Sequence, residues 1–119
     1  MKYFLLIFSI IIINGTFSIP QTNVPLTEDS QERLFAAIAE YLDAPYKIGG
    51  ITPKGVDCSA LTQVIYEHAF NLPLPYPITE QYAQGENVND INELLAGDLI
   101  FFNISTKDKP DHIGIYIGN

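Results

Sequence analysis

The chain has 119 residues, which fits one small domain, and 47% of them are hydrophobic, which is enough for a packed core. Six Lys and Arg residues stand against 14 Asp and Glu residues, for a formal net charge of −8 without any basic cluster. This charge excludes binding to nucleic acid or to an anionic membrane through a basic face. The single cysteine excludes an intrachain disulfide and a cysteine-rich zinc site. The two histidines lack metal-site spacing, so we expect neither a metal nor another cofactor.

Residues 1–18 have the pattern of a signal peptide. Lys2 gives a positive start, an apolar run of about ten residues extends from Phe4 to Ile13, and small residues suited to cleavage follow as far as Ser18. The run is too short to span a bilayer. We therefore expect export to the periplasm or cell wall, with no stable membrane anchor after cleavage. An uncleaved anchor is the alternative.

Residues 19–29 form a polar, proline-bearing linker, and the domain is expected over residues 30–119. Thr27 or Ser30 caps a first helix that runs to about Asp43, where Pro45 follows. One apolar stripe predicts its core face: Leu34, Phe35, Ile38, Tyr41 and Leu42. This stripe is typical of a packed helix rather than of a cofactor site.

A second helix is predicted over residues 58–70, and three prolines make residues 71–77 irregular. A short helix over 79–85 and an acidic loop over 87–95 follow. Residues 99–102 form an apolar run typical of a buried strand, and residues 112–117 alternate as a second strand does. Helices followed by strands predict an α+β domain with helices packed on an antiparallel sheet.

Cys58 stands where the second helix begins. The helix dipole favours the thiolate at this position, and the thiolate is the nucleophile. An ordinary buried cysteine is the alternative.

A nucleophilic thiol needs a nearby base. His68 lies ten residues along the same helix, about 15 Å away, and is expected to be a packed or partly exposed helical residue. His112 opens the second strand and shares one face with Gly114, while three isoleucines occupy the other face. The thiol and the imidazole meet if the helix packs on the face that carries His112.

Four segments resemble, in order and approximate spacing, the motifs of the NlpC/P60 family of cysteine peptidases, over about residues 30–119. They are Pro45-Tyr46-Lys47-Ile48-Gly49-Gly50, Val56-Asp57-Cys58-Ser59, Gly97-Asp98-Leu99-Ile100-Phe101-Phe102 and Asp111-His112-Ile113-Gly114-Ile115-Tyr116-Ile117-Gly118. The resemblance implies a papain-like α+β fold. It also implies hydrolysis of peptidoglycan stem peptides between D-γ-glutamyl and a diamino acid, without a cofactor.

By this resemblance Cys58 is the nucleophile and His112 the general base. Tyr46 matches a family tyrosine that orients substrate or oxyanion, although it is also compatible with simple packing at a turn. Ser59 is a tentative substrate or oxyanion contact, and capping or packing is the alternative for both Ser59 and Asp57. Gln81 fits a family glutamine and is a weaker candidate for contact with the substrate. Backbone N–H groups at the helix start are expected to hold the oxyanion.

Three features depart from the family pattern. Ala60 replaces a common glycine, and residues 72–79 lack an arginine that often follows Leu-Pro. The third departure concerns the polar residue that orients the imidazole, which the family carries on the strand after His112. Asn119, seven residues beyond His112 and about 23 Å away in an extended strand, is too far to take this role. We therefore expect a fragment that lacks the C-terminal strands.

Two further hypotheses remain open beside the exported peptidase. One is a catalytically silent domain that binds the cell wall or a partner on the same scaffold. The other keeps the fold but changes the chemistry to amidase or acyl-transfer activity. The sequence does not indicate an oligomeric state.

Overall fold

The computed structural model describes residues 3–8, 25–105 and 107–118. Its elements, in chain order, are β1 (Tyr3–Phe8), α1 (Glu28–Ala39), β2 (Ile51–Thr52), β3 (Gly55–Val56), α2 (Cys58–Phe70), α3 (Ile78–Tyr82), β4 (Gly85–Val88), the 3₁₀ turn η1 (Ile91–Glu93), β5 (Leu99–Phe102) and β6 (His112–Ile115). Four strands form one antiparallel sheet in the order β4-β1-β5-β6, and β2 pairs with β3 in a separate hairpin. This arrangement confirms the α+β class.

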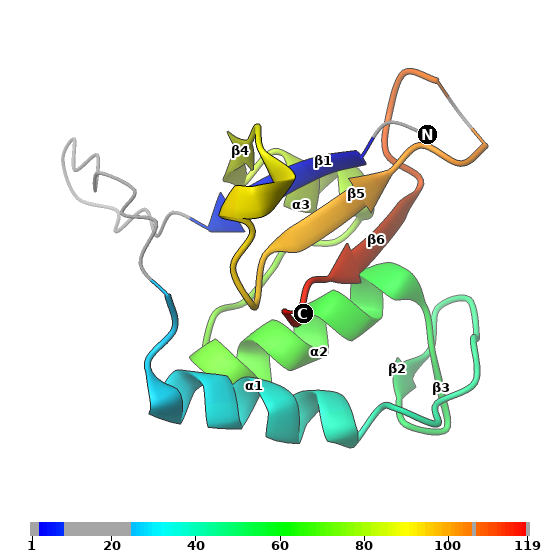
Figure 1. The fold of residues 1–119 in the computed structure, drawn as a ribbon. Helices are drawn as coiled ribbons and strands as arrows, with labels where there is room; N and C mark the ends of the chain where they lie inside the picture. Colours follow the sequence, from blue (N-terminus) through cyan, green and yellow to red (C-terminus); the bar gives the residue numbers. More distant parts are fainter. Residues whose placement is uncertain (1–2, 9–24, 106, 119) are drawn as a thin grey trace, which may run out of the picture.

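The helices lie in layers against the sheet, with α2 between α1 and the strands (Figure 1). Tyr66 of α2 joins Leu99, Phe101 and Ile113 of the sheet in one buried cluster. Leu34 and Ala37 of α1 join Ile65 and Ala69 of α2 in a second cluster, against which Ile115 packs. Because α2 contributes to both clusters, its position is fixed from two sides.

The boundaries of α2 follow from local chemistry. Asp57 is its N-cap, with a side-chain oxygen that accepts from the N–H of Ala60 at 2.9 Å. Asn71 ends the helix in the left-handed conformation, at φ 54°, which asparagine tolerates better than most residues. The predicted range of residues 58–70 is therefore confirmed.

Other predicted boundaries are corrected. Helix α1 ends at Ala39 rather than near Asp43, because the chain continues in turns in which Tyr41 N–H bonds to Ile38 O at 2.9 Å. Part of the acidic segment predicted as a loop is β4, which pairs with β1 through backbone bonds that need no apolar pattern. Strand β6 ends at Ile115, and Ile117 is exposed.

Strand β1 comes from the segment predicted to be a signal peptide. Pairing of these residues does not test whether the segment is removed, so the signal peptide stays a prediction. Its expected cleavage site at Ser18 and most of the linker lie outside the described residues. Within the described ranges, no helix combines the length and the apolar character that crossing a bilayer requires.

Candidate active site

Cys58 is the first residue of α2 and is partly buried against the cluster that contains Phe101 and Ile113. The carboxylate of Asp57 occupies one of the free N–H groups at this helix start, that of Ala60, at 2.9 Å. The Asp57 carbonyl accepts the first intrahelical bond, from Leu61 N–H at 2.9 Å. In the described part of the chain, no acceptor is bonded to the N–H groups of Cys58 and Ser59. Two N–H donors without a partner beside a sulfur are the arrangement that an oxyanion site requires.

The same carboxylate fixes the turn that carries Tyr46. The second oxygen of Asp57 accepts from the N–H of Gly49 at 2.9 Å, and Asp57 N–H bonds to Gly50 O at 3.3 Å. A Cβ at Gly50 would lie 2.2 Å from Gly55 O, so only glycine fits this close approach. The backbone of Tyr46 bridges to Val56, and its side chain is 68% exposed. Tyr46 thus lies near the start of α2 with an exposed side chain.

His112 opens β6, directly after a loop closed by its neighbour Asp111. The Asp111 carboxylate accepts from the N–H groups of Ile104 at 2.6 Å and Ser105 at 2.5 Å, while Asp111 N–H bonds to Phe102 O at 3.0 Å. His112 pairs in register with Phe102, and the two ring centroids are 5.9 Å apart. The imidazole is half-buried. The hydrogen bonds of Asp111 and the pairing with Phe102 fix the backbone that carries the His112 imidazole.

Helix α2 packs on the opposite face of β6 from the one considered in the sequence. Its Tyr66 clusters with Ile113, and its Ile65 and Ala69 lie in the cluster against which Ile115 packs. Residues 112 and 114 face the other way, since side chains alternate along a strand. The condition under which the thiol and the imidazole meet across this face, α2 packed on the His112 side, is therefore not met, and α2 covers the isoleucine face instead. Burying two isoleucines stabilises the fold more than burying a histidine and a glycine.

The two proposed catalytic residues nevertheless belong to neighbouring ends of packed elements. Helix α2 contacts β6, and both begin toward the same end of the molecule (Figure 1). No hydrogen bond between the Cys58 sulfur and the imidazole is present within the described ranges. Catalytic hydrogen bonds are often long in ligand-free structures and tighten with the substrate, so this geometry leaves the pair available.

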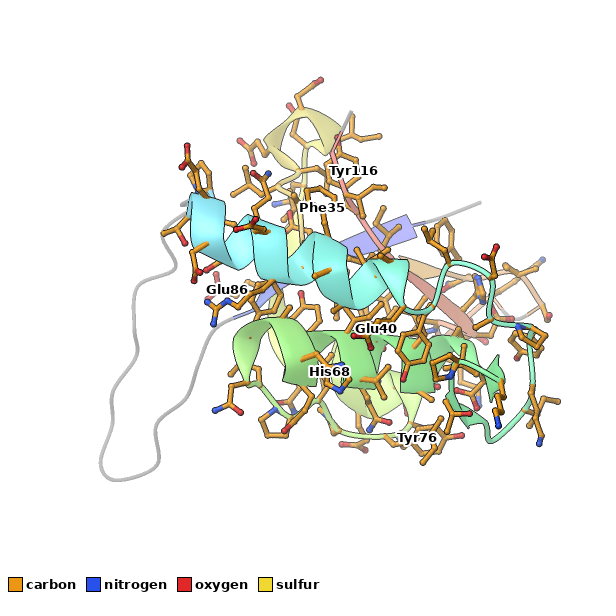
Figure 2. The ribbon with its side chains drawn as sticks, turned by 90° about the horizontal axis from the view of Figure 1, so that it is seen from below. Phe35, Glu40, His68, Tyr76, Glu86 and Tyr116 are labelled. Atoms are coloured by element: carbon orange, nitrogen blue, oxygen red, sulfur yellow. The ribbon has the colours of Figure 1, made fainter. Side chains whose placement is uncertain are left out.

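His68 lies near the far end of α2, as predicted. Figure 2 shows α1 and α2 side by side, with Glu40 and His68 turned toward one another between them. The Nδ1 atom of His68 is 3.9 Å from the Glu40 carboxylate, and the His68 side chain is 49% exposed. A position in the last turn also suits a positive charge near the helix C-terminus. His68 therefore interacts with α1.

Gln81, a weaker candidate for contact with the substrate, is fully buried in the ligand-free structure. Its side chain is 0% exposed, its Nε2 donates to Ser59 O at 3.0 Å, and its Oε1 accepts from the Thr62 hydroxyl at 2.6 Å. Gln81 instead ties α3 to the first turn of α2. Ser59 and Asp57 are each 6% exposed, so both are packed at the helix start. The structural role of Gln81 was missed because sequence spacing alone gives no sign of contact between α3 and α2.

The site contains no candidate metal centre. Over residues 3–8, 25–105 and 107–118, no three His, Cys, Asp or Glu side chains group closely enough to hold an ion.

The NlpC/P60 family profile matches residues 43–119. The chain is 36% identical over 97 residues to the murein DD-endopeptidase MepS/murein LD-carboxypeptidase of Escherichia coli K12, covering 82% of this chain and 50% of the relative. It is 34% identical to the gamma-DL-glutamyl hydrolase of Bacillus subtilis 168, covering 81% of this chain and 21% of the relative. The chain thus spans half or less of the length of these curated relatives.

A solved structure has the same fold. The crystal structure of the NlpC/p60 domain of peptidoglycan hydrolase SagA superposes with a TM-score of 0.64 at 26% identity, covering 75% of this chain and 74% of that domain. The family profile covers well over half of the chain, and its range includes Tyr46, Cys58 and His112. The chain belongs to the NlpC/P60 family.

Proposed function

We propose that this protein is a cysteine peptidase that hydrolyses the peptide stems of bacterial peptidoglycan. The observation that carries the proposal is the placement of this chain's single cysteine at a capped helix start, next to two N–H groups without a partner among the described residues. Helix α2 and strand β6, which carry Cys58 and His112, also begin toward the same end of the molecule. The names of the E. coli relative and of the SagA domain support the substrate class.

In the proposed reaction the Cys58 thiol gives its proton to His112, and the thiolate attacks the scissile carbonyl carbon. The N–H groups of Cys58 and Ser59 donate to the oxyanion. His112 then protonates the leaving amine as the C–N bond breaks, which leaves a thioester on Cys58. Water attacks the thioester, His112 accepts the proton of this water, and the sulfur departs. Tyr46, exposed beside the helix start, contacts the substrate.

The bond we propose is the one between D-γ-glutamyl and a diamino acid, in agreement with the name of the B. subtilis relative. The name of the E. coli relative instead indicates DD-endopeptidase and LD-carboxypeptidase activities. Mass spectrometry of digested muropeptides separates these specificities. Cleavage after γ-glutamate releases an L-alanyl-D-glutamate dipeptide from an unsubstituted stem, whereas DD-cleavage converts cross-linked dimers to monomers. Export of the protein to the periplasm or cell wall belongs to the same proposal.

The test uses purified muropeptides and four forms of the protein. Cys58→Ala and His112→Ala are expected to lower kcat/KM by about 10³-fold or more, because they remove the nucleophile and its base. His68→Ala is the matched control, since His68 contacts α1 rather than the site, and should retain most activity. Unchanged turnover in Cys58→Ala, or equal losses in the two histidine variants, would contradict the proposal.

A silent binding domain on the same scaffold is the second candidate, favoured by the absence of a hydrogen bond between Cys58 and His112 in the described structure. Alkylation by iodoacetamide at neutral pH separates the two. A Cys58 that reacts no faster than a cysteine in an unfolded peptide favours the silent domain, and a faster reaction that His112→Ala abolishes favours the enzyme. Amidase or acyl-transfer chemistry would appear as different products in the mass spectra.

A further inference from the structure

Positive charge is scarce on this protein, and most of it lies in the two segments of the sequence that precede Cys58 and His112. Of the six Lys and Arg residues, Lys2 lies outside the described residues, and Arg33 on α1 is paired with Asp29 at 3.0 Å. The other four are lysines in two segments, residues 44–56 and 103–111. The first segment leads into Cys58 and the second leads into His112. In a chain with a net charge of −8, this distribution gives the site a local charge unlike that of the rest of the surface.

The first segment carries the clearer positive charge. Residues 44–56 contain Lys47 and Lys54, both exposed, and no acidic residue. The backbone N–H of Lys47 bonds to Val56 O at 3.1 Å, two residues before the nucleophile. The aliphatic part of the Lys47 side chain packs over Gly55, because a Cβ added to Gly55 would lie 2.8 Å from the Cβ and Cδ atoms of Lys47. Lys47 is thus held against the strand that enters α2, with an ammonium group free to extend from it.

Acidic residues weaken the positive charge of the two segments, 44–56 and 103–111, to different degrees. Both carboxylate oxygens of Asp57 accept backbone N–H groups, and the same holds for Asp111. Asp108 is exposed between the two lysines of the second segment, so its charge opposes theirs. The hairpin side of the site therefore offers the stronger attraction for an anion.

We propose that Lys47 and Lys54 form a subsite for a free carboxylate next to the scissile bond. This inference rests on the proposed function. A γ-glutamyl linkage uses the side-chain carboxyl of glutamate, so the α-carboxylate remains free within a few bonds of the carbonyl that Cys58 attacks. The two lysines attract this carboxylate through exposed, salt-sensitive ion pairs. The enzyme is accordingly selective for stems whose glutamyl α-carboxylate is free over stems in which it is a carboxamide.

The experiment compares two synthetic stem peptides that differ only in this group, an α-carboxylate or an α-carboxamide. At low ionic strength the wild-type chain is expected to favour the carboxylate peptide about tenfold in kcat/KM, mainly through KM, as two exposed ion pairs allow. At 0.5 M NaCl the preference should shrink several-fold, because the Debye length falls. Lys47→Gln/Lys54→Gln should bring the ratio close to one, and Lys47→Arg/Lys54→Arg should preserve it.

Arg33→Gln is the matched control, because it removes one positive charge on α1 and should leave the ratio unchanged. Equal cleavage of both peptides by the wild type, or an unchanged ratio in the double Gln variant, overturns the subsite and leaves the peptidase proposal intact. Cleavage of neither peptide counts against the proposed function. In that case calorimetric binding of the two peptides to Cys58→Ala still decides the inference, since equal dissociation constants overturn it.

Discussion

The buried amide of Gln81 connects the short helix α3 to the turn that carries Cys58, and Gln81→Met tests this connection. Methionine keeps an unbranched side chain of similar length but removes both hydrogen-bonding groups. The substitution breaks the bonds to Ser59 O at 3.0 Å and to the Thr62 hydroxyl at 2.6 Å. At about 1 kcal/mol for each bond, the direct loss is about 2 kcal/mol.

Part of this loss is recoverable. The Thr62 hydroxyl has one proton, and it also lies 2.8 Å from Ser59 O. Once Gln81 is gone, that proton turns to Ser59 O, so neither group stays unpaired. We therefore expect Gln81→Met to lower the free energy of unfolding by about 1–2 kcal/mol rather than more. Urea unfolding followed by circular dichroism measures this change.

Gln84→Met is the control, because Gln84 is exposed just after α3 and should change stability by less than about 0.5 kcal/mol. Thr62→Val completes a double-mutant cycle with Gln81→Met. Because the two side chains are directly bonded, their effects should fail to add by at least about 0.5 kcal/mol. Additive effects, or equal losses in Gln81→Met and Gln84→Met, would refute the reasoning.

Two other predictions concern buried carboxylates. Asp57→Asn should keep the helix cap but set an amide N–H₂ against the Gly49 N–H, and should therefore lower the free energy of unfolding in urea by about 1 kcal/mol. Asp57→Ala loses both hydrogen bonds and should lower it by about twice as much. Equal losses in the two variants would argue against a contribution from the bond to Gly49. Burial raises the pKa of Asp98 above its ordinary value of 3.8, against a smaller opposing effect of the Leu95 N–H. A carboxyl whose pKa is higher in the folded state favours folding when protonated, so acidification from neutral pH through the raised pKa should stabilise the wild type relative to Asp98→Asn. Parallel stability curves for the two proteins between neutral pH and pH about 4 would disprove this.

The elements with local signals are the ones that the sequence predicts well. The range of α2 follows from Asp57, which caps its start, and Asn71, which ends it in a left-handed conformation. Strand β5 is found at residues 99–102 as predicted, because a short apolar run between a glycine turn and a polar loop is typical of a buried strand. In each case the determining residues lie within a few positions of the boundary.

Non-local contacts account for what the sequence did not predict. Strand β4 has the sequence Gly-Glu-Asn-Val, which has no strand pattern, and it forms because β1 offers backbone partners. The contact of Gln81 with Ser59 joins residues 22 positions apart. Alternation identifies the two faces of β6 but does not show which one a given helix will bury, and α2 buries the isoleucine face.

The site consists of two halves that are each fixed by their own hydrogen bonds. Asp57 ties the Tyr46 turn to the start of α2, and Asp111 closes the loop that delivers His112. Neither set of bonds crosses from one half to the other. The relative position of sulfur and imidazole therefore depends on the packing of α2 against β6, through Tyr66 and Ile113 in the buried cluster. Because a packed core deforms little, the cluster that stabilises the fold also sets the distance over which the proposed proton transfer would take place.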